Sequence, residues 1–217
     1  MSSLDLAGLV CETIGSRRLL AHPFYRRWEE GRLRKDELAA YAGQYRHVEA
    51  ALPDVLSTIA TGLPEGRPRS LTEENLADEL GRPAPHLELF DAFAAAVGAR
   101  PDAEPGPATE ALVELQVTAA RDAPVAGLAV LAAYESQAAE VAATKAEGLR
   151  RHYGIEGDGV RFWEVHASME ASHASWSFDA LSEITEDPEP VIAAADAAAA
   201  AWWAFLDERD TADSRFA

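Results

Sequence analysis

Cysteine and lysine are both scarce in this sequence. Its 217 residues include one cysteine, Cys11, which excludes an internal disulfide and a zinc site built from several thiolates. A single thiol suits a reducing compartment, and we expect Cys11 to be buried as a small hydrophobic residue. Of the 19 basic residues 17 are arginine, which leaves Lys35 and Lys145 as the only lysines.

Positive charge is scarce as well. The chain has 37 acidic residues against 19 basic ones, a formal net charge of −18, so a nucleic acid or an anionic membrane surface would be repelled. No basic, apolar leader is present at the start, and no apolar run approaches the roughly 18 residues of a membrane-spanning helix. We expect a cytoplasmic protein without nucleic-acid or membrane partners.

Strict alternation of apolar and polar residues is missing, whereas apolar residues recur every three or four positions. The pattern predicts an all-α fold, a single-domain bundle of seven or eight helices over residues 1–217, with its chemistry between facing helices. The predicted helices cover about 3–18, 23–30, 35–61, 70–80, 86–97, 108–121, 124–152, 160–185 and 189–208. The second of these, 23–30, is little more than a turn or two.

The strongest local motif is a pair of histidines and a glutamate near residue 170. His166, Glu170 and His173 are spaced i, i+4 and i+7, so their side chains share one face of a helix. Nitrogen and oxygen donors without sulfur suit iron, manganese or zinc. The alternative is a hydrated polar face on which the histidines are incidental.

A second acid and histidine are separated by a helix break. Glu79 and His86 are seven residues apart, and Gly81, Pro83 and Pro85 lie between them. Proline interrupts a helix, so Glu79 is expected to close one helix and His86 to open the next. The two side chains then either converge on a metal or form a helix-terminal acid and a surface histidine.

A third piece is Glu135, which has alanines at positions 138, 139, 142 and 143 along its predicted helix. Small neighbours leave room for a buried carboxylate, which needs a partner such as a metal ion. The alternative is a solvated side chain on an amphipathic helix. Together the three pieces supply three glutamates and three histidines, the set used by carboxylate-bridged centres of two metal ions in helical bundles.

Lys145 is a separate candidate, ten residues after Glu135 on the same alanine-rich helix. Arginine does not deprotonate in proteins, whereas a partly buried lysine does and then serves as a nucleophile or amine donor. The alternative for Lys145 is a surface cation that pairs with Glu147 or another acid.

These residues resemble the signature of the haem-oxygenase-like di-metal oxidases, which is a Glu and a His seven apart, a lone Glu, and a His-x3-Asp/Glu-x2-His motif. Segments 22–33, 41–53 and 134–149 extend the resemblance. It implies a seven-helix bundle shared with thiaminase II and the quinone-forming oxidase of pyrroloquinoline quinone biosynthesis. It also implies two iron ions or an iron–manganese pair, O₂ as co-substrate and an external reductant. The implied metal ligands are Glu79, His86, Glu135, His166, Glu170 and His173.

Within the family the sequence is most similar to the branch named for a chlamydial protein associating with death domains, which makes para-aminobenzoate for folate. The resemblance implies that an internal tyrosine, here Tyr25, supplies the aromatic ring and that Lys145 supplies the amino group. It places Tyr41 and Tyr134 beside them as pocket tyrosines. The alternative for Tyr25 is a purely structural role in the aromatic core.

The sequence departs from this branch at two site positions and in the break at residues 81–85, which is more proline-rich than usual. Glu170 stands where Asp is common, and Phe162 stands where a tyrosine is expected, which puts a radical relay through position 162 in doubt. His47 and Glu49 are expected to support the ligands as polar neighbours. A homodimer is implied by family analogy alone.

Two other functions remain open. A sibling oxidase would act on a free small molecule by amino-acid N-oxygenation, desaturation or C–C cleavage. A protein of another class would be a metal-free helical interaction module. Iron binding separates the oxidases from the module, and the side chains around Glu135, Lys145 and Tyr25 separate the two oxidases.

Overall fold

A computed structural model describes residues 5–81 and 83–210, and every regular element in those ranges is a helix. The predicted all-α class is confirmed. Nine α-helices lie in these ranges, more than the predicted seven or eight, because the short second segment is a regular helix of its own. They are α1 Leu6–Thr13, α2 Pro23–Glu29, α3 Lys35–Gly62, α4 Arg67–Gly81, α5 His86–Ala96, α6 Pro107–Asp122, α7 Pro124–Tyr153, α8 Asp158–Ile184 and α9 Glu189–Asp210.

The first helix is shorter than the predicted 3–18, of which residues 3 and 4 lie outside the described part. Asp5 caps α1 by accepting a hydrogen bond from the Gly8 amide at 2.9 Å. After Ile14 the chain continues as two short 3₁₀ turns, Gly15–Arg17 and Leu19–Ala21, since glycine weakens the helix there.

Cys11 is exposed, so its predicted burial was wrong. The buried face of this segment is formed by Leu6, Val10 and Ile14, which are four residues apart. Cys11 follows Val10 and is rotated by about 100° from that face toward solvent.

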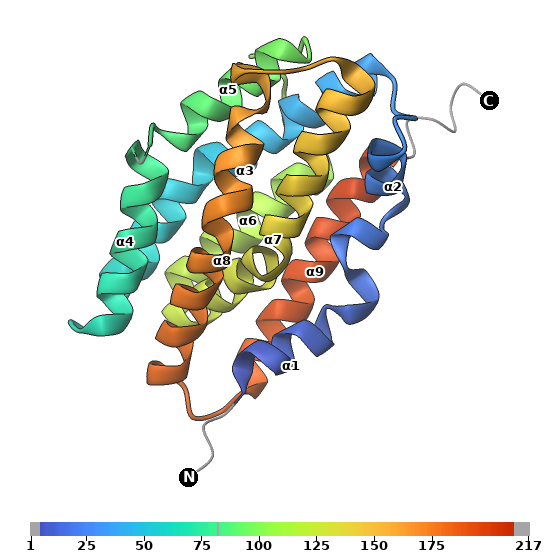
Figure 1. Ribbon diagram of the computed structural model, residues 1–217. Coiled ribbons are helices and arrows are strands. Elements are labelled where there is room, and N and C mark those ends of the chain that lie inside the picture. The colour runs from blue at the N-terminus through green and yellow to red at the C-terminus, as the bar shows by residue number, and fades with distance from the viewer. Residues whose placement is uncertain (1–4, 82, 211–217) are drawn as a thin grey trace.

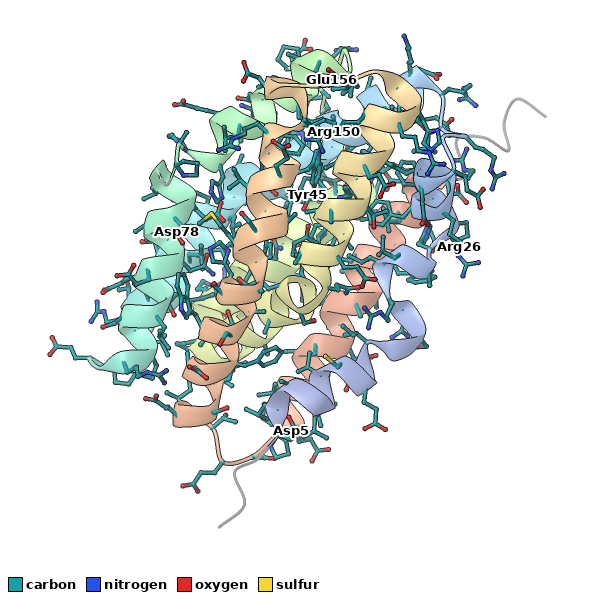
Figure 2. All side chains as sticks on the ribbon, in the orientation of Figure 1. Asp5, Arg26, Tyr45, Asp78, Arg150 and Glu156 are labelled. Atoms are coloured by element: carbon teal, nitrogen blue, oxygen red, sulfur yellow. The ribbon has the colours of Figure 1, made fainter. Side chains whose placement is uncertain are left out.

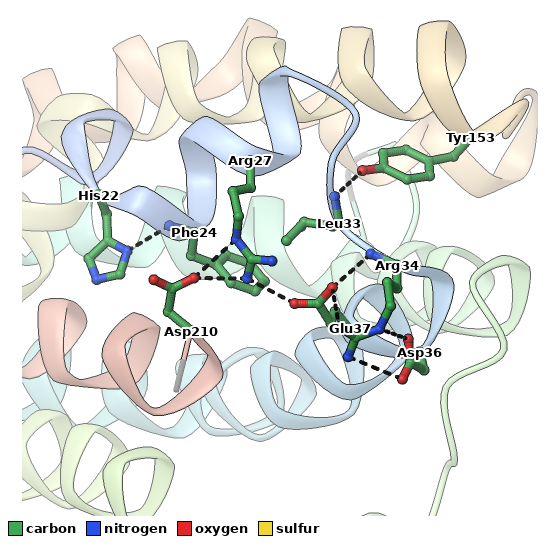
Figure 3. A network of polar contacts seen from close by, with 9 residues as sticks. All are labelled: His22, Phe24, Arg27, Leu33, Arg34, Asp36, Glu37, Tyr153 and Asp210. Atoms are coloured by element: carbon green, nitrogen blue, oxygen red, sulfur yellow. Dashed lines mark hydrogen bonds and ion pairs between the residues drawn. The ribbon is translucent and has the colours of Figure 1, made fainter. Parts of the chain in front are cut away.

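A polar network ties α2 to α3 and α9 (Figure 3). The Arg27 guanidinium donates to Glu37 and to Asp210, both at 2.8 Å. His22 caps α2 by accepting a hydrogen bond from the Phe24 amide at 3.1 Å, and Pro23 occupies the first helical position. These contacts hold the short helix that carries Tyr25 against the two long ones.

The long helix α7 lies at the centre of the bundle. It runs beside α8, and α9, α6 and α3 also pack against it (Figure 1). Close approach requires glycine at one contact in particular, because a Cβ atom on Gly148 would lie 2.8 Å from Cδ1 of the buried Trp28 ring. The helix ends at Tyr153 and is capped by Gly154, whose left-handed φ of 66° is a conformation that glycine adopts readily.

The buried apolar residues form two clusters that share α3, α6, α7, α8 and α9. One is rich in aromatic rings from α2, α3, α5, α8 and α9, and the other is mainly aliphatic and includes the buried face of α1. Figure 2 shows Tyr45 in the interior of the bundle, whereas Arg26 projects from its surface. None of the helices in the described residues is long and apolar enough to cross a membrane.

Candidate metal centre and tyrosine–lysine cluster

Three of the six predicted ligands meet between the ends of α4 and α5 and the middle of α8. Glu79, His86 and His166 each offer a ligand atom, and these atoms all lie within 4.8 Å of one another. Glu79 Oε2 is 2.9 Å from His86 Nδ1, so the two residues converge across the proline-rich break as predicted. Both are buried, which excludes the alternative of a helix-terminal acid and a surface histidine.

The other three predicted ligands face the same space. Glu135, Glu170 and His173 line a cavity of about 30 Å³ together with Glu79 and His166. All are buried, and the spacing on α8 brings its two histidines and its glutamate to this one cavity. A space of this size holds water molecules or bare ions and little else.

The imidazoles of α8 are oriented by acceptors behind them. His166 Nδ1 lies 2.9 Å from the Phe162 carbonyl oxygen, and His173 Nε2 lies 3.3 Å from Asp78 Oδ2. A histidine that binds a metal usually donates its other N–H to a carbonyl or carboxylate. These contacts therefore leave His166 Nε2 and His173 Nδ1 as the ring nitrogens that are available to coordinate a metal. The sequence reasoning missed Asp78, although its position beside Glu79 was a signal.

Phe162, which stands where a tyrosine was expected, is buried against His166 with 4.0 Å between ring centroids. Its ring supports the imidazole by packing and has no hydroxyl to lose. A radical relay through this position is therefore absent from this chain.

Glu135 is held by two neutral donors that the sequence did not single out. Asn75 Nδ2 donates to Oε1 at 2.9 Å, and Ser177 Oγ donates to Oε2 at 2.6 Å. Burial raises the pKa of Glu135 above its usual value, and these hydrogen bonds oppose the increase. Glu135 is buried, so the alternative of a solvated side chain on an amphipathic helix is wrong.

Carboxyl groups are concentrated in this cavity. Burial raises the pKa of Glu170 well above its usual range, and the charges of Glu135 and Glu79 raise it further. Burial also lowers the pKa of His166 to about 4, so that imidazole is neutral near pH 7. For Glu79 burial acts to raise the pKa, but the His86 hydrogen bond and the nearby imidazoles leave it below its usual value.

These residues fit a bound metal ion. Glu170 Oε2 is buried without a hydrogen-bond partner, and a buried carboxylate oxygen in that state needs a cation. Neutral imidazoles and carboxylates, with no sulfur, form a donor set that suits iron.

A second cluster surrounds Lys145, whose exposed fraction is 1%. Its Nζ atom lies 2.6 Å from the Tyr41 hydroxyl, which is 2.8 Å from the Tyr25 hydroxyl. Nζ also lies 4.6 Å from the centroid of the Tyr25 ring and 4.0 Å from that of Trp163. The alternative of a surface cation paired with Glu147 is wrong, since Glu147 is exposed and Lys145 is not.

The environment of Lys145 favours the neutral amine. Burial lowers the pKa of Lys145 well below its ordinary value, and the charge of Glu49 only partly opposes this. No ion pair of Lys145 occurs in residues 5–81 and 83–210, where its closest polar contact is the Tyr41 hydroxyl.

Tyrosines connect the two clusters. The Tyr41 and Tyr45 rings lie 5.5 Å apart between centroids, and the Tyr45 hydroxyl is 2.5 Å from the Tyr134 hydroxyl. Tyr45 and Tyr134 both line the cavity of about 30 Å³ that the predicted ligands share, which we call the metal-facing cavity. The series Tyr25, Tyr41, Tyr45 and Tyr134 therefore runs without interruption from the lysine to the cavity. Tyr45 was missed from the sequence, although it follows Tyr41 by one helical turn.

The two polar neighbours expected on α3 behave differently. His47 Nε2 contacts the Ala103 carbonyl oxygen at 2.8 Å and lies outside the cavity lining, so it does not support the ligands. Glu49 is buried and lines the cavity. Residues two apart on a helix point about 200° apart, so the two side chains cannot face the same site.

The fold and the buried set of histidines and carboxylates define an all-helical protein of the haem-oxygenase-like type. A domain of unknown function with a heme oxygenase-like fold from Shewanella denitrificans superposes with a TM-score of 0.81 at 19% identity, covering 99% of this chain and 96% of that one. A family model described as iron-containing redox enzyme matches residues 39–208. The chain therefore belongs to this family of iron-containing redox enzymes.

Curated relatives agree with the predicted branch. A protein from Nitrosomonas europaea named 4-aminobenzoate synthase is 36% identical over 212 residues, which cover 89% of this chain and 86% of the relative. One of the same name from Chlamydia pneumoniae is 30% identical over 205 residues, 91% of this chain and 92% of the relative. The resemblance to an oxidoreductase of the chlamydial branch is thus confirmed.

Proposed function

We propose that this chain is a 4-aminobenzoate synthase that takes the aromatic ring from its own Tyr25 and the amino group from its own Lys145. The observation that carries the proposal is the buried Lys145 amine, which lies 4.6 Å from the centroid of the Tyr25 ring and forms no ion pair within the described residues. The names of the relatives support the same product.

The chemistry asks two things of these residues. Converting a tyrosine side chain to 4-aminobenzoate replaces the phenolic oxygen by nitrogen, breaks the Cα–Cβ bond and oxidises Cβ to the carboxylate carbon. An amine must therefore be near the phenol, and an oxidant must be reachable from the same ring. Lys145 meets the first need, and the tyrosine series to the cavity meets the second.

The metal centre consists, in this proposal, of two iron ions or of one iron and one manganese. Iron bound there would supply the activation of O₂, with electrons from an external reductant. Since carboxylates and neutral imidazoles are deprotonated ligands, binding is expected to release protons. The residues proposed to hold the metals are Glu79, His86, Glu135, His166, Glu170 and His173.

Tyr41 is placed to orient both reacting groups. Its hydroxyl contacts Lys145 Nζ at 2.6 Å and Tyr25 at 2.8 Å, so one side chain holds the amine beside the phenol. Burial raises the pKa of Tyr25 and of Tyr41 and lowers that of Lys145, which favours the neutral form of each. A neutral amine retains the lone pair that bond formation to carbon requires. Tyr45 and Tyr134 complete the path for electrons toward the cavity.

The size of the cavity favours an internal tyrosine over a free substrate. Pockets that bind small molecules usually have volumes of roughly 300 Å³ or more. The cavity lined by five of the six proposed ligands, all but His86, measures about 30 Å³. A sibling oxidase that acts on a free amino acid would need space that these side chains fill.

Isotope labelling tests the proposal directly. Protein labelled with ¹⁵N only at lysine is supplied with Fe(II), O₂ and reductant, and the product and the intact chain are analysed by mass spectrometry. We expect ¹⁵N-labelled 4-aminobenzoate, at most one molecule per chain, and a mass loss that maps to Tyr25 and Lys145. Tyr25→Phe and Lys145→Arg should form no product. Tyr153→Phe and Lys35→Arg are matched controls and should retain it.

Two outcomes would contradict self-consumption. One is wild-type product yield from Tyr25→Phe. The other is unlabelled product formed in many turnovers while Tyr25 remains intact. Failure of the wild-type chain to bind iron would reject the oxidase as a whole.

A further inference from the structure

The metal-facing cavity contains a fourth carboxylate that the ligand signature does not include. Glu49, near the middle of α3, has an exposed fraction of 6% and lines the cavity beside Glu79, Glu135 and Glu170. Its Oε2 atom is buried without a hydrogen-bond partner. None of the six residues of the signature lies on α3, so Glu49 is the acidic side chain through which this helix faces the cavity.

The protein offers Glu49 little compensation for its burial. No ion pair of Glu49 with a lysine, arginine or histidine occurs in the described residues. Burial raises the pKa of Glu49 well above its usual range, and the charge of Glu79 raises it further, whereas Lys145 and Tyr45 act to lower it. Lys145 gives little help, since its amine is itself buried and contacts the Tyr41 hydroxyl. A buried carboxylate with an orphaned oxygen beside another carboxylate needs a cation.

Among the carboxylates that line the cavity, the charges balance when Glu49 is counted. Two divalent ions bring four positive charges, and the three glutamates of the signature neutralise three of them. The histidines are neutral as ligands and contribute nothing to the sum. Glu49 is the fourth carboxylate lining the same cavity, which makes the loaded site neutral.

We propose that Glu49 is a further metal ligand, by which α3 joins α4, α5, α7 and α8 at the centre. The inference rests on the proposed di-metal function and deepens it. Tyr41, Tyr45 and Glu49 follow one another at intervals of four residues on α3, so they share one face of that helix. Metal binding at Glu49 would therefore fix α3 in register and hold the two tyrosines between the metal centre and Lys145.

Metal binding to the apoprotein tests this role without reference to product formation. Fe(II) is titrated anaerobically into the wild type, Glu49→Gln and Glu49→Asp, and the bound metal and its Mössbauer spectrum are measured. We expect Glu49→Gln to weaken binding of at least one of the two ions about tenfold or more, with a changed spectrum for that site. Glu49→Asp keeps the charge and should recover most of the affinity.

A matched control is available on the same helix. Glu37 is also buried, with an exposed fraction of 5%, but it pairs with Arg27 and does not line the cavity. Glu37→Gln should therefore bind both ions as the wild type does. In urea unfolding of the apoproteins, Glu49→Gln should be at least as stable as the wild type, because the substitution keeps the shape of the side chain and breaks no ion pair.

The results separate the two proposals. If the wild type binds two irons and Glu49→Gln binds both with unchanged affinity and spectrum, the ligand role is overturned and the proposed function survives. Loss of product without any change in metal binding would overturn it equally. If the wild type binds no iron, the proposed function itself fails.

Discussion

The Lys145 amine and the Tyr41 hydroxyl lie 2.6 Å apart with exposed fractions of 1% and 0%. A lysine so deeply buried usually has a carboxylate beside it, but here the nearest polar group is a phenol. The phenol in turn contacts Tyr25, the tyrosine proposed to supply the ring. This relationship favours a neutral Lys145 amine held beside a tyrosine over a structural cation.

The first prediction concerns the pH dependence of stability. Burial lowers the pKa of Lys145 well below its usual value in the folded chain, whereas the unfolded chain keeps Lys145 protonated up to about pH 10. Above the folded pKa the unfolded state binds the extra proton, so stability rises with pH through that window. In urea unfolding of the apoproteins, the stability of the wild type relative to Lys145→Met should increase by up to about 1.4 kcal/mol per pH unit as the pH rises toward about 10.

Lys35→Met is the control for this measurement, because Lys35 is exposed at the start of α3. Its stability relative to the wild type should not follow the same trend. Parallel curves for the wild type and Lys145→Met would mean that Lys145 is charged in the fold.

The second prediction concerns Asp78, which accepts from His173 Nε2 at 3.3 Å. Replacing it with asparagine keeps the shape but removes the charge that orients the imidazole. Loss of such a partner typically weakens metal affinity by about 10- to 100-fold, and we expect Asp78→Asn to do so in anaerobic Fe(II) titration. Glu73→Gln, an exposed change on the same helix, should have no effect. Equal affinities would show that Asp78 does not act through His173.

The third prediction concerns the tyrosine series. Tyr45→Phe removes the hydroxyl that lies 2.5 Å from Tyr134 but keeps the ring packed beside Tyr41. We expect iron binding to be unchanged and single-turnover product formation to slow by about tenfold or more, a rise of about 1.4 kcal/mol in the barrier. Tyr153→Phe removes a peripheral hydroxyl and should retain the wild-type rate. An unaffected rate in Tyr45→Phe would place the electron path elsewhere.

The fourth prediction tests the packing of α2 against α7. Gly148→Ala would bring Cβ to within 2.8 Å of the Trp28 ring, whose buried position leaves it little room to move. Overpacking of this kind costs about 1–3 kcal/mol of unfolding free energy, which outweighs the better helix propensity of alanine. Gly15→Ala, where no atom lies within 4 Å of the added methyl, should change the urea midpoint little. A Gly148→Ala variant as stable as the wild type would disprove the contact.

Much of the architecture was predictable because its causes are local. Apolar spacing, Pro23 and Pro124 at helix starts and Gly154 at a helix end act within a few residues, and the helices from α2 onward begin and end close to their predicted ranges. The spacing of His166, Glu170 and His173 likewise determines that they share a face. The exceptions were Cys11 and the length of α1, because a short helix buries whichever face its neighbours cover.

The tertiary structure alone decided which side chains share the buried space. Asp78, Asn75 and Ser177 lie on two helices far apart in the sequence, and only packing brings them to His173 and Glu135. Sequence spacing on α3 offers Glu37, Glu49 and His47 as comparable polar side chains, and the rotation of the helix selects Glu49 for the cavity. The sequence thus determined the residue types of the proposed ligands and their local spacing. Packing decided their convergence, because burial and the distances between helices depend on the whole bundle.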